Sequence, residues 1–401
     1  MSTDGAARPS QPAKLTFALV CLSTLGNFVA QGLLYPALPL YLTRELGTSK
    51  AVAGLVVSVL ALTSIAIRPW AGSFIDRVGR RPLLIAGPAL ATLSAVGLLT
   101  MHFVVAVLLM RLVQGAGSAM TYSSAVAAVA DVAPPERRAG YLALFSTFFY
   151  VGFALGPFIA ELLIESSGFD AVWWTVGAFT AFGAVVALFV RETRPAGSPA
   201  DAAAAPVPML HRLFHPAARL PGMVFFCTGI GWTAIASFLS LYAREIGLSN
   251  SDVLFIALSL SVLATRFASG GLADRFGRLA VAFPCLVLVA AGLAGLAAFD
   301  SPVAAVISLV VFGVGYSGGF PAMLTLVVDR APERERGVAM ASFNVYFDIG
   351  APLGGYGVGQ LIDWGGFPLG FGVSAAAATA GLLFLPALRR PAPRTEAAVA
   401  R

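Results

Sequence analysis

Two charged side chains, Asp348 and Arg111, lie within strongly apolar stretches of the sequence and could take part in proton chemistry. Burial in an apolar environment favours the neutral, protonated form of a carboxyl group, whereas a nearby guanidinium favours the charged form. If Asp348 and Arg111 approach each other, the protonation of Asp348 would depend on the conformation of the protein. Asp348 is therefore the leading candidate for a proton site, and the alternative is a structural partner for a backbone group or for Arg111.

Arg111 begins the segment Arg111-Leu-Val-Gln114-Gly115-Ala-Gly117. A lone Arg in lipid costs at least ~2.5–3.5 kcal/mol, so we expect Arg111 to have a partner or to face water. The alternative is a side chain that extends to the outer membrane surface, because Arg111 lies near that end of its apolar stretch.

Other polar and aromatic side chains are spaced so that they could line the same cavity. Asn27 and Gln31 are four residues apart, Asn344 precedes Asp348 by one helical turn, and Tyr122 shares a helical face with Arg111. The alternatives are hydrogen bonds between helices for the amides, and packing for Trp232. The predicted cavity is lined by Asn27, Gln31, Arg111, Gln114, Tyr122, Trp232, Asn344 and Asp348.

The composition excludes an ordinary soluble protein. Soluble domains are roughly 45–50% apolar and about 25% charged, whereas this chain of 401 residues is 58% apolar and 11% charged, with a mean hydropathy of +0.84. Each membrane crossing needs ~20 apolar residues, and every crossing should be helical because irregular backbone is not tolerated against lipid. The sequence therefore predicts an all-α membrane protein with 12 transmembrane helices, at 15–42, 51–71, 82–100, 103–130, 139–164, 170–190, 221–243, 252–270, 279–298, 302–328, 337–362 and 367–388.

The distribution of basic residues predicts the orientation. Only Arg44, Lys50 and Arg244 fall in turns on the side opposite the termini, so the positive-inside rule places both termini in the cytoplasm. This topology accounts for the net charge of +6, and we expect no nucleic-acid partner. The predicted organisation is a cytoplasmic tail at 1–14, a six-helix half at 15–190, a cytoplasmic linker at 191–220, a second six-helix half at 221–388 and a tail at 389–401.

An internal repeat relates the two halves. A shift of 198 positions places the segment from Arg68 to Arg80 on the segment from Arg266 to Arg278, with six identities. The same shift pairs Asp131 with Asp329 and continues through the next helices. Two parallel repeats imply a pseudo-two-fold axis along the membrane normal and a site near the midplane between them.

The most specific motif lies between the second and third helices, where we expect a loop. It reads Gly72-Ser-Phe-Ile-Asp76-Arg77-Val-Gly79-Arg80-Arg81 and places one carboxylate among three guanidinium groups at the cytoplasmic mouth. Topology alone is the simpler interpretation of such a basic cluster. The spacing, however, resembles the signature of the major facilitator superfamily at every defining position, and the resemblance covers nearly the whole chain.

That resemblance implies a fold of two pseudo-symmetric six-helix bundles and a charge network that latches their cytoplasmic ends in one state. The second copy of the motif has Leu279 in place of its last basic residue. The residues to which this gating role is carried over are Gly72, Asp76, Arg77, Gly79, Arg80, Arg81, Asp274, Arg275, Gly277 and Arg278.

Two further segments resemble motifs of the same family. The segment that starts at Arg111 is similar to one whose Arg faces the cavity and is implicated in proton coupling. The segment with Gly152, Gly156 and Pro157 is similar to an antiporter motif that bends the fifth helix and seals the outward end, although it closes with Ala160-Glu161 instead of two glycines. Close helix packing by small residues is the alternative for this segment.

The function that we expect is secondary active transport of a small solute by alternating access, with proton-coupled efflux of a drug or metabolite. No phosphate-binding loop, zinc spacing or nucleophile motif is present, so we expect neither an enzyme nor a metal or cofactor. The alternatives are an uptake symporter or uniporter for a polar metabolite, and a solute sensor that does not transport. We expect a monomer in the cytoplasmic membrane, with protons and the small solute as its partners.

Overall fold

The computed structural model describes residues 12–100, 102–134, 137–194, 210, 213–268, 275–332 and 335–389, and these residues contain helices and no strands. In the first half, the helices are α1 (Ala13–Arg44), α2 (Lys50–Val78), α3 (Arg81–Thr100), α4 (Val104–Val132) and α5 (Arg138–Leu188). In the second half they are η2 (Pro216–Ala218), α7 (Arg219–Glu245), α8 (Asp252–Ala268), α10 (Arg278–Ala298), α11 (Pro302–Arg330), α12 (Arg336–Pro352), η4 (Leu353–Gly357), α13 (Val358–Leu382) and η5 (Pro386–Arg389).

The described helices account for twelve membrane crossings. Nine helical segments within the described ranges are long and apolar enough to span a membrane. Two of them contain two crossings each, because α5 turns at Gly168 and α13 turns at Gly365 and Gly366, where the backbone is not helical. The remaining crossing is α8, of which 17 residues are described. The predicted all-α membrane fold with 12 helices is therefore confirmed.

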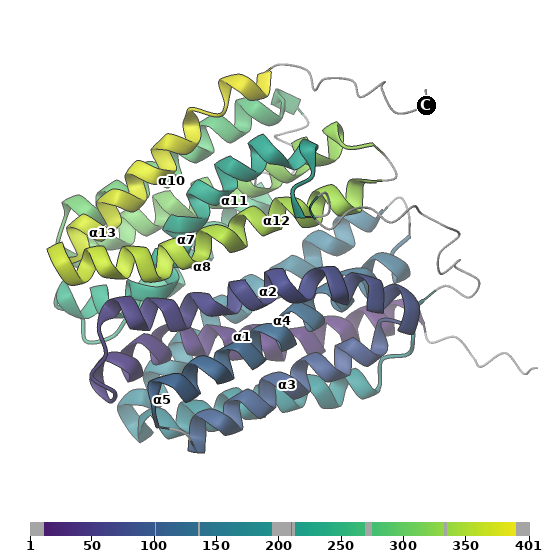
Figure 1. Cartoon of the computed structure of the whole chain (residues 1–401), viewed down its shortest axis with the longest axis horizontal. Coiled ribbons are helices and arrows are strands. Elements are labelled where there is room, and N and C mark those ends of the chain that lie inside the picture. Colours follow the sequence, from purple (N-terminus) through teal and green to yellow (C-terminus); the bar gives the residue numbers. More distant parts are fainter. Residues whose placement is uncertain are drawn as a thin grey trace, which may run out of the picture.

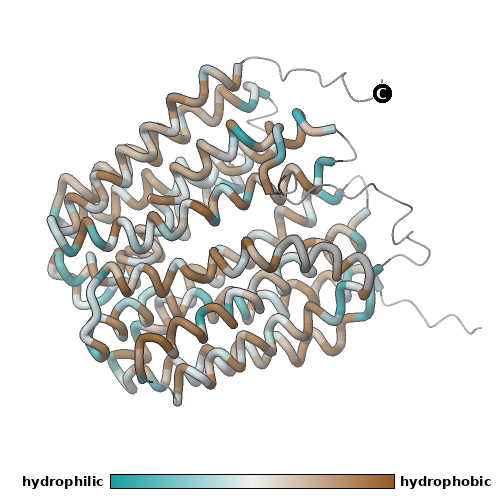
Figure 2. Tube along the Cα trace, viewed as in Figure 1, coloured by the Kyte–Doolittle hydropathy of each residue, from teal (hydrophilic) through white to brown (hydrophobic). Residues whose placement is uncertain are grey.

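The helices form two bundles that lie side by side along their length (Figure 1). Helices α1 to α5 form one bundle, and α7 to α13 form the other. Hydrophilic residues are concentrated toward the two ends of the bundles, and hydrophobic residues cover most of the length between them (Figure 2). We call the end at which α1 begins the inner end and the opposite end the outer end.

Backbone geometry follows the internal repeat. Six glycines among the described residues have a positive φ, a conformation that side chains disfavour. They fall into three pairs. Gly79 and Gly277, at 117° and 92°, and Gly168 and Gly366, at 79° and 77°, are related by the shift of 198, and Gly47 and Gly247, at 62° and 84°, are 200 positions apart. Each pair ends or interrupts a helix at the same place in its half, so the duplication seen in the sequence extends to the turns.

Glycines also set the packing within each half. A Cβ atom on Gly156 would lie 2.4 Å from the backbone of Gly32 in α1, and one on Gly152 would lie 2.6 Å from the backbone of Phe28. In the second half, a Cβ atom on Gly354 would lie 2.3 Å from the carbonyl oxygen of Ile230 in α7. The predicted gating glycines Gly152 and Gly156 therefore bring α5 against α1, and Pro157 lies inside α5 directly after them.

Candidate functional site

The side chain of Arg111 is buried at the junction of α4, α2 and α1, with 3% of its surface exposed. Its Nη1 donates to Oε1 of Gln114 at 2.5 Å and, at a longer distance of 3.5 Å, to Oε1 of Gln31. Its Nε and Nη2 donate to the backbone oxygens of Val56 and Val57 at 3.3 and 3.1 Å. Arg111 does not extend to the membrane surface, because every nitrogen of its guanidinium is bound within the first half.

Asp348 is also buried, with 5% of its surface exposed, and belongs to α12, a helix that packs against α2 and α7. Asn344, one turn earlier, donates to the backbone oxygen of Met340 in its own helix at 3.0 Å. The described partners of Arg111 do not include Asp348. The predicted approach of Asp348 to Arg111 stays a prediction.

The remaining cavity candidates have different surroundings. Trp232 in α7 is buried and stacks on Tyr316 in α11, with ring centroids 4.4 Å apart. Asn27 is buried against Gly183 of α5, and its Nδ2 has no hydrogen-bond partner among the described residues. Tyr122 in α4 is 47% exposed. The structure thus joins three of the candidates, Gln31, Gln114 and Arg111, by hydrogen bonds.

Sequence reasoning missed a second guanidinium among the helices, that of Arg266 in α8, which is partly buried and whose Nε is fully buried. Its Nη1 donates to Oγ of Ser146 at 3.2 Å, and its Nη2 donates to the hydroxyl of Tyr150 at 3.0 Å. Both partners lie in α5, so these hydrogen bonds connect the two halves. The repeat could have drawn attention to Arg266, because it pairs with Arg68 inside an apolar helix.

A buried carboxylate joins the halves at the outer end. Glu161 in α5 is 2% exposed, and its Oε2 lies 2.9 Å from Nη2 of Arg244 in α7. Its Oε1 accepts hydrogen bonds from the hydroxyl and the backbone N–H of Ser251, the latter at 3.1 Å. Ser251 directly precedes α8, so Glu161 caps the N-terminus of a helix in the other half.

A second carboxylate makes the corresponding contact at the outer end. Asp363 in α13 accepts hydrogen bonds from the backbone N–H groups of Lys50 and Ala51 at 3.0 and 2.9 Å, at the N-terminus of α2. Helices α2 and α8 begin at equivalent places in the repeat. Each half thus caps the second helix of the other half with a carboxylate.

The backbones of the halves touch beside this second contact. A Cβ atom on Gly54 in α2 would lie 2.3 Å from the carbonyl oxygen of Gly355 in η4 and 2.6 Å from Cζ of Phe238 in α7. A Cβ atom on Gly355 would lie 2.3 Å from the carbonyl oxygen of Gly54. Only glycine at these two positions allows α2 and η4 to approach so closely.

At the inner end, two ion pairs each join residues of the same half. Nε of Arg80 lies 2.8 Å from Oδ2 of Asp131 in α4, and Nε of Arg278 lies 3.2 Å from Oδ2 of Asp329 in α11. These two pairs are equivalent at the repeat shift. Nε2 of His215, which directly precedes η2, also lies within hydrogen-bond distance, 2.7 Å, of Oε2 of Glu335.

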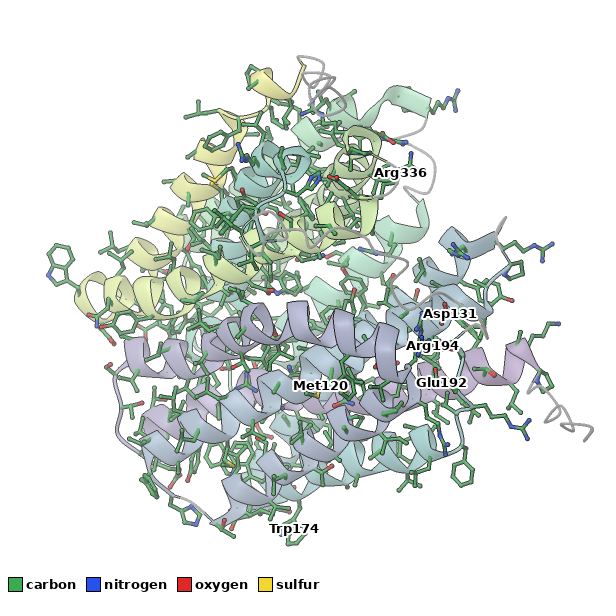
Figure 3. The ribbon with its side chains drawn as sticks, turned by 45° about the vertical axis from the view of Figure 1, so that its right-hand side comes forward. Met120, Asp131, Trp174, Glu192, Arg194 and Arg336 are labelled. Carbon is green, nitrogen blue, oxygen red and sulfur yellow. The ribbon has the colours of Figure 1, made fainter. Side chains whose placement is uncertain are left out.

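Glu192, which follows α5, lies with Gly79, Arg80, Arg81 and Asp131 at the inner end of the first half, and we call these residues the inner cluster. Its carboxylate accepts hydrogen bonds from the backbone N–H groups of Arg80 and Arg81 at 2.9 and 3.1 Å. Burial alone would raise the pKa of Glu192, but hydrogen bonds from four backbone N–H groups outweigh it and lower the pKa below its usual range. Figure 3 shows Asp131, Glu192 and Arg194 close together at this end.

The structure describes only some of the residues that were predicted to take part in gating. Gly79, Arg80 and Arg81 lie in the inner cluster, where a Cβ atom on Gly79 would lie 2.3 Å from Oε2 of Glu192. The expected loop is wrong for Gly72 to Val78, because α2 continues as a helix to Val78, and the chain turns only at Gly79 and Arg80.

In the second copy, Gly277 precedes α10, and the guanidinium of Arg275 lies 5.4 Å from the ring centroid of Phe276. The side-chain surroundings of Asp76 and Arg77, and the whole of Asp274, lie outside the described residues.

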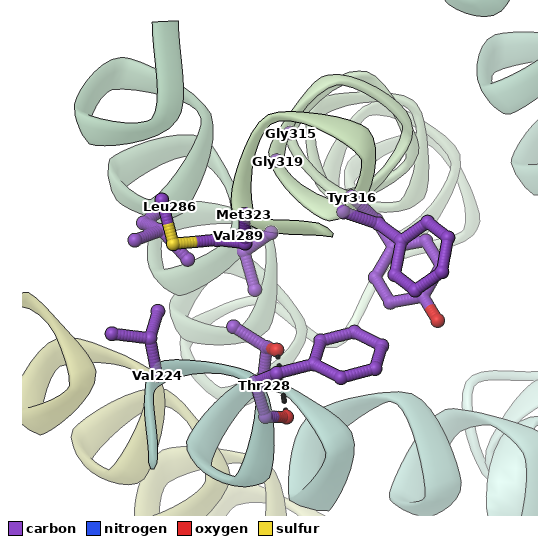
Figure 4. Close-up of a pocket in the computed structure, with 10 residues that line it drawn as sticks. Val224, Thr228, Leu286, Val289, Gly315, Tyr316, Gly319 and Met323 are labelled. Carbon is purple, nitrogen blue, oxygen red and sulfur yellow. Dashed lines mark hydrogen bonds between the residues drawn. The ribbon is translucent and has the colours of Figure 1, made fainter. Parts of the chain in front are cut away.

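The pocket drawn in Figure 4 is not the predicted central cavity. It lies inside the second half between α7, α10 and α11, and its cavity volume is about 10 Å³. Its polar side chain Thr228 donates to the backbone oxygen of Phe225 in its own helix. This pocket has room for about one water molecule. Within the described part of the chain, no group of three His, Cys, Asp or Glu side chains could hold a metal ion.

Comparisons with known proteins agree on one family. The model of the Major Facilitator Superfamily matches residues 20–355 and 222–401. The uncharacterized MFS-type transporter YhhS of Escherichia coli (strain K12) is 24% identical over 388 residues, which are 94% of each chain. The uncharacterized MFS-type transporter PA1993 of Pseudomonas aeruginosa is 27% identical over 413 residues, with 97% of this chain and 98% of the relative covered.

Two solved structures share the fold. The human organic anion transporter MFSD10 (TETRAN) is 19% identical with a TM-score of 0.72. A point mutant of the nucleoside transporter NupG is 16% identical with a TM-score of 0.74. Each match covers 94% of this chain and 100% of the other.

Proposed function

The chain belongs to the major facilitator superfamily and is a multi-pass membrane carrier rather than an enzyme. We propose that it exports a small solute in exchange for protons. It acts by alternating access, as a monomer in the cytoplasmic membrane with both termini in the cytoplasm. One solute and one or more protons use the space between the halves in turn.

One observation carries the alternating-access proposal. The ion pair of Glu161 with Arg244, the cap of Asp363 on α2 and the contact of Gly54 with Gly355 all cross between the halves at the outer end. Contacts of this kind hold a carrier closed at that end, and breaking them would open it.

The proton-coupled part of the proposal rests on Asp348. A carboxyl group that is 5% exposed inside a membrane helix is costly when charged, so its protonation is linked to any movement that changes its surroundings. Helix α12 continues into η4, a π-helical turn that touches α2 of the other half. Protonation of Asp348 can therefore bias the position of η4 and, with it, the outer contact. Outward export is supported by the similarity of the segment around Gly152, Gly156 and Pro157 to an antiporter motif.

Asp348→Asn is expected to abolish pH-driven transport while leaving solute exchange intact. Asparagine keeps the shape of the side chain but cannot release a proton. The assay uses proteoliposomes and a solute selected by thermal-shift screening of the purified protein against drugs, sugars, amino acids and siderophores. Flux is measured with an imposed pH gradient and, separately, as counterflow without one.

Asp300→Asn is the matched control, because Asp300 is exposed between α10 and α11 and should behave like the parent in both assays. Full pH-driven flux in Asp348→Asn would end the assignment of the proton to this residue. Loss of counterflow as well would show that Asp348 binds the solute instead.

A further inference from the structure

Arg266 places a positive charge between the two halves. It belongs to α8 of the second half, and its two Nη atoms donate to Ser146 and Tyr150 of α5 in the first half. The guanidinium also lies over the ring of Tyr150, with Cζ 4.8 Å from the centroid. Both hydrogen-bond acceptors are neutral hydroxyl groups, so these contacts leave the charge of Arg266 uncompensated.

The guanidinium of Arg266 also has one N–H donor that is not used in a hydrogen bond to a described residue. Its Nε is buried and has no hydrogen-bond partner among the described residues, and no described carboxylate pairs with it. A buried donor that finds no acceptor is destabilising, and more so when the group is charged. Arg111 is different, because each of its three nitrogens donates to an acceptor inside the first half. Arg111 is thus satisfied by the protein, whereas Arg266 is suited to an anion from outside the chain.

Aromatic side chains from both halves adjoin this charge. Tyr316 lies close enough to Tyr150 and Arg266 for electrostatic interaction and stacks on Trp232. The ring centroids of Trp232 and Phe153 are 5.2 Å apart, and those of Phe153 and Tyr35 are 4.8 Å apart. These rings come from α1, α5, α7 and α11, so they form a continuous aromatic run across the interface between the halves.

We infer that the transported solute is an organic anion with a flat aromatic body, whose carboxylate binds Arg266 and whose body lies against Trp232 and Tyr316. A carboxylate accepts two parallel hydrogen bonds from a guanidinium, which Nε and one Nη of Arg266 can supply. Tyr150 and Ser146 hold the guanidinium in place when the site is empty. This inference deepens the proposed transport function and rests on it for the direction of movement, but not for binding.

Binding of three ligands of the same shape to the purified full-length protein tests the inference. Isothermal calorimetry in detergent compares 2-naphthoate, 2-naphthamide and 2-naphthylmethylammonium at neutral pH. The parent should bind the carboxylate at least ~10-fold more tightly than the amide, because charge-assisted hydrogen bonds are stronger than neutral ones, and should bind the ammonium least. In Arg266→Gln, the affinity for the carboxylate should fall to that for the amide.

Arg138→Gln is the control, since Arg138 is an exposed Arg at the start of α5 and its loss should leave the preference unchanged. If Arg266→Gln is not monodisperse, Arg266→Lys keeps the charge but loses the planar fork, and it should retain less than half of the preference. A parent that binds no naphthoate, or binds it no better than the amide, overturns the inference, as does an unchanged preference in Arg266→Gln. Because no gradient is present, these outcomes are independent of proton coupling.

Discussion

Gly54→Val is expected to hold the carrier with its outer end open and to stop turnover. A Cβ atom at this position would lie 2.3 Å from the carbonyl oxygen of Gly355 and 2.6 Å from Phe238, both in the other half. Adding side-chain carbon atoms to a close-packed contact destabilises it by ~1–3 kcal/mol. The closed outer state would lose that free energy, so the access equilibrium should shift roughly 5- to 150-fold toward the outward-open state.

The measurement is the labelling rate of a cysteine introduced near the outer end, together with counterflow in proteoliposomes. Gly54→Val should label faster than the parent and show almost no counterflow. Gly357→Val is the matched control, because Gly357 lies in the same π-helical turn as Gly355 but a Cβ atom there would meet nothing within 4 Å. Equal labelling rates in Gly54→Val and the parent would contradict the role given to this contact.

Glu161→Ala is expected to open the outer end as strongly. The substitution removes the ion-pair partner of Arg244 and the acceptor of two hydrogen bonds from Ser251. Truncating one partner of a buried, hydrogen-bonded charge pair costs ~2–5 kcal/mol. Arg244 is 21% exposed, so the lower end of that range applies, and ~2 kcal/mol is about 30-fold in the access equilibrium.

Glu165→Ala controls for the loss of a carboxylate on the same helix, because Glu165 is one turn further along α5 and exposed. It should label and transport like the parent. The double variant Glu161→Ala with Arg244→Ala should open little further than Glu161→Ala alone, since the ion pair is already broken. Fully additive effects of the two substitutions would argue against a direct pairing of these residues.

The sequence predicted the repeat and the twelve crossings because hydrophobic length and spacing determine them. It also predicted burial for Arg111 and Asp348, since a charged residue in a long apolar stretch is costly against lipid and therefore faces the interior of the bundle. The inner turn was misplaced, because α2 continues past Gly72 to Val78. Helix ends in water depend on local capping, and apolar length does not mark them.

Contacts between the halves could not be predicted in the same way. Glu161 appeared in the sequence only as a departure from the antiporter motif, and its convergence with Arg244 and Ser251 from the other half could not be foreseen. The hydrogen-bond partners of Arg266 could not be predicted, because Tyr150 and Ser146 lie more than a hundred positions away in the sequence. Residues that make contacts between the halves can be recognised only when it is known which helices pack together. A single sequence does not contain that information.

In alternating access, the outer contacts between the halves break when inner contacts form. Spin-label distances test it most directly, with one pair at Ser167 and Trp364 on the outer turns and one pair at Arg138 and Gly337 on the inner turns, in a background without Cys21, Cys227 and Cys285. Relative to the parent, Gly54→Val should lengthen the outer distance and shorten the inner distance in the same sample. Lengthening of both distances, or a change in the outer pair alone, would contradict alternating access by this protein.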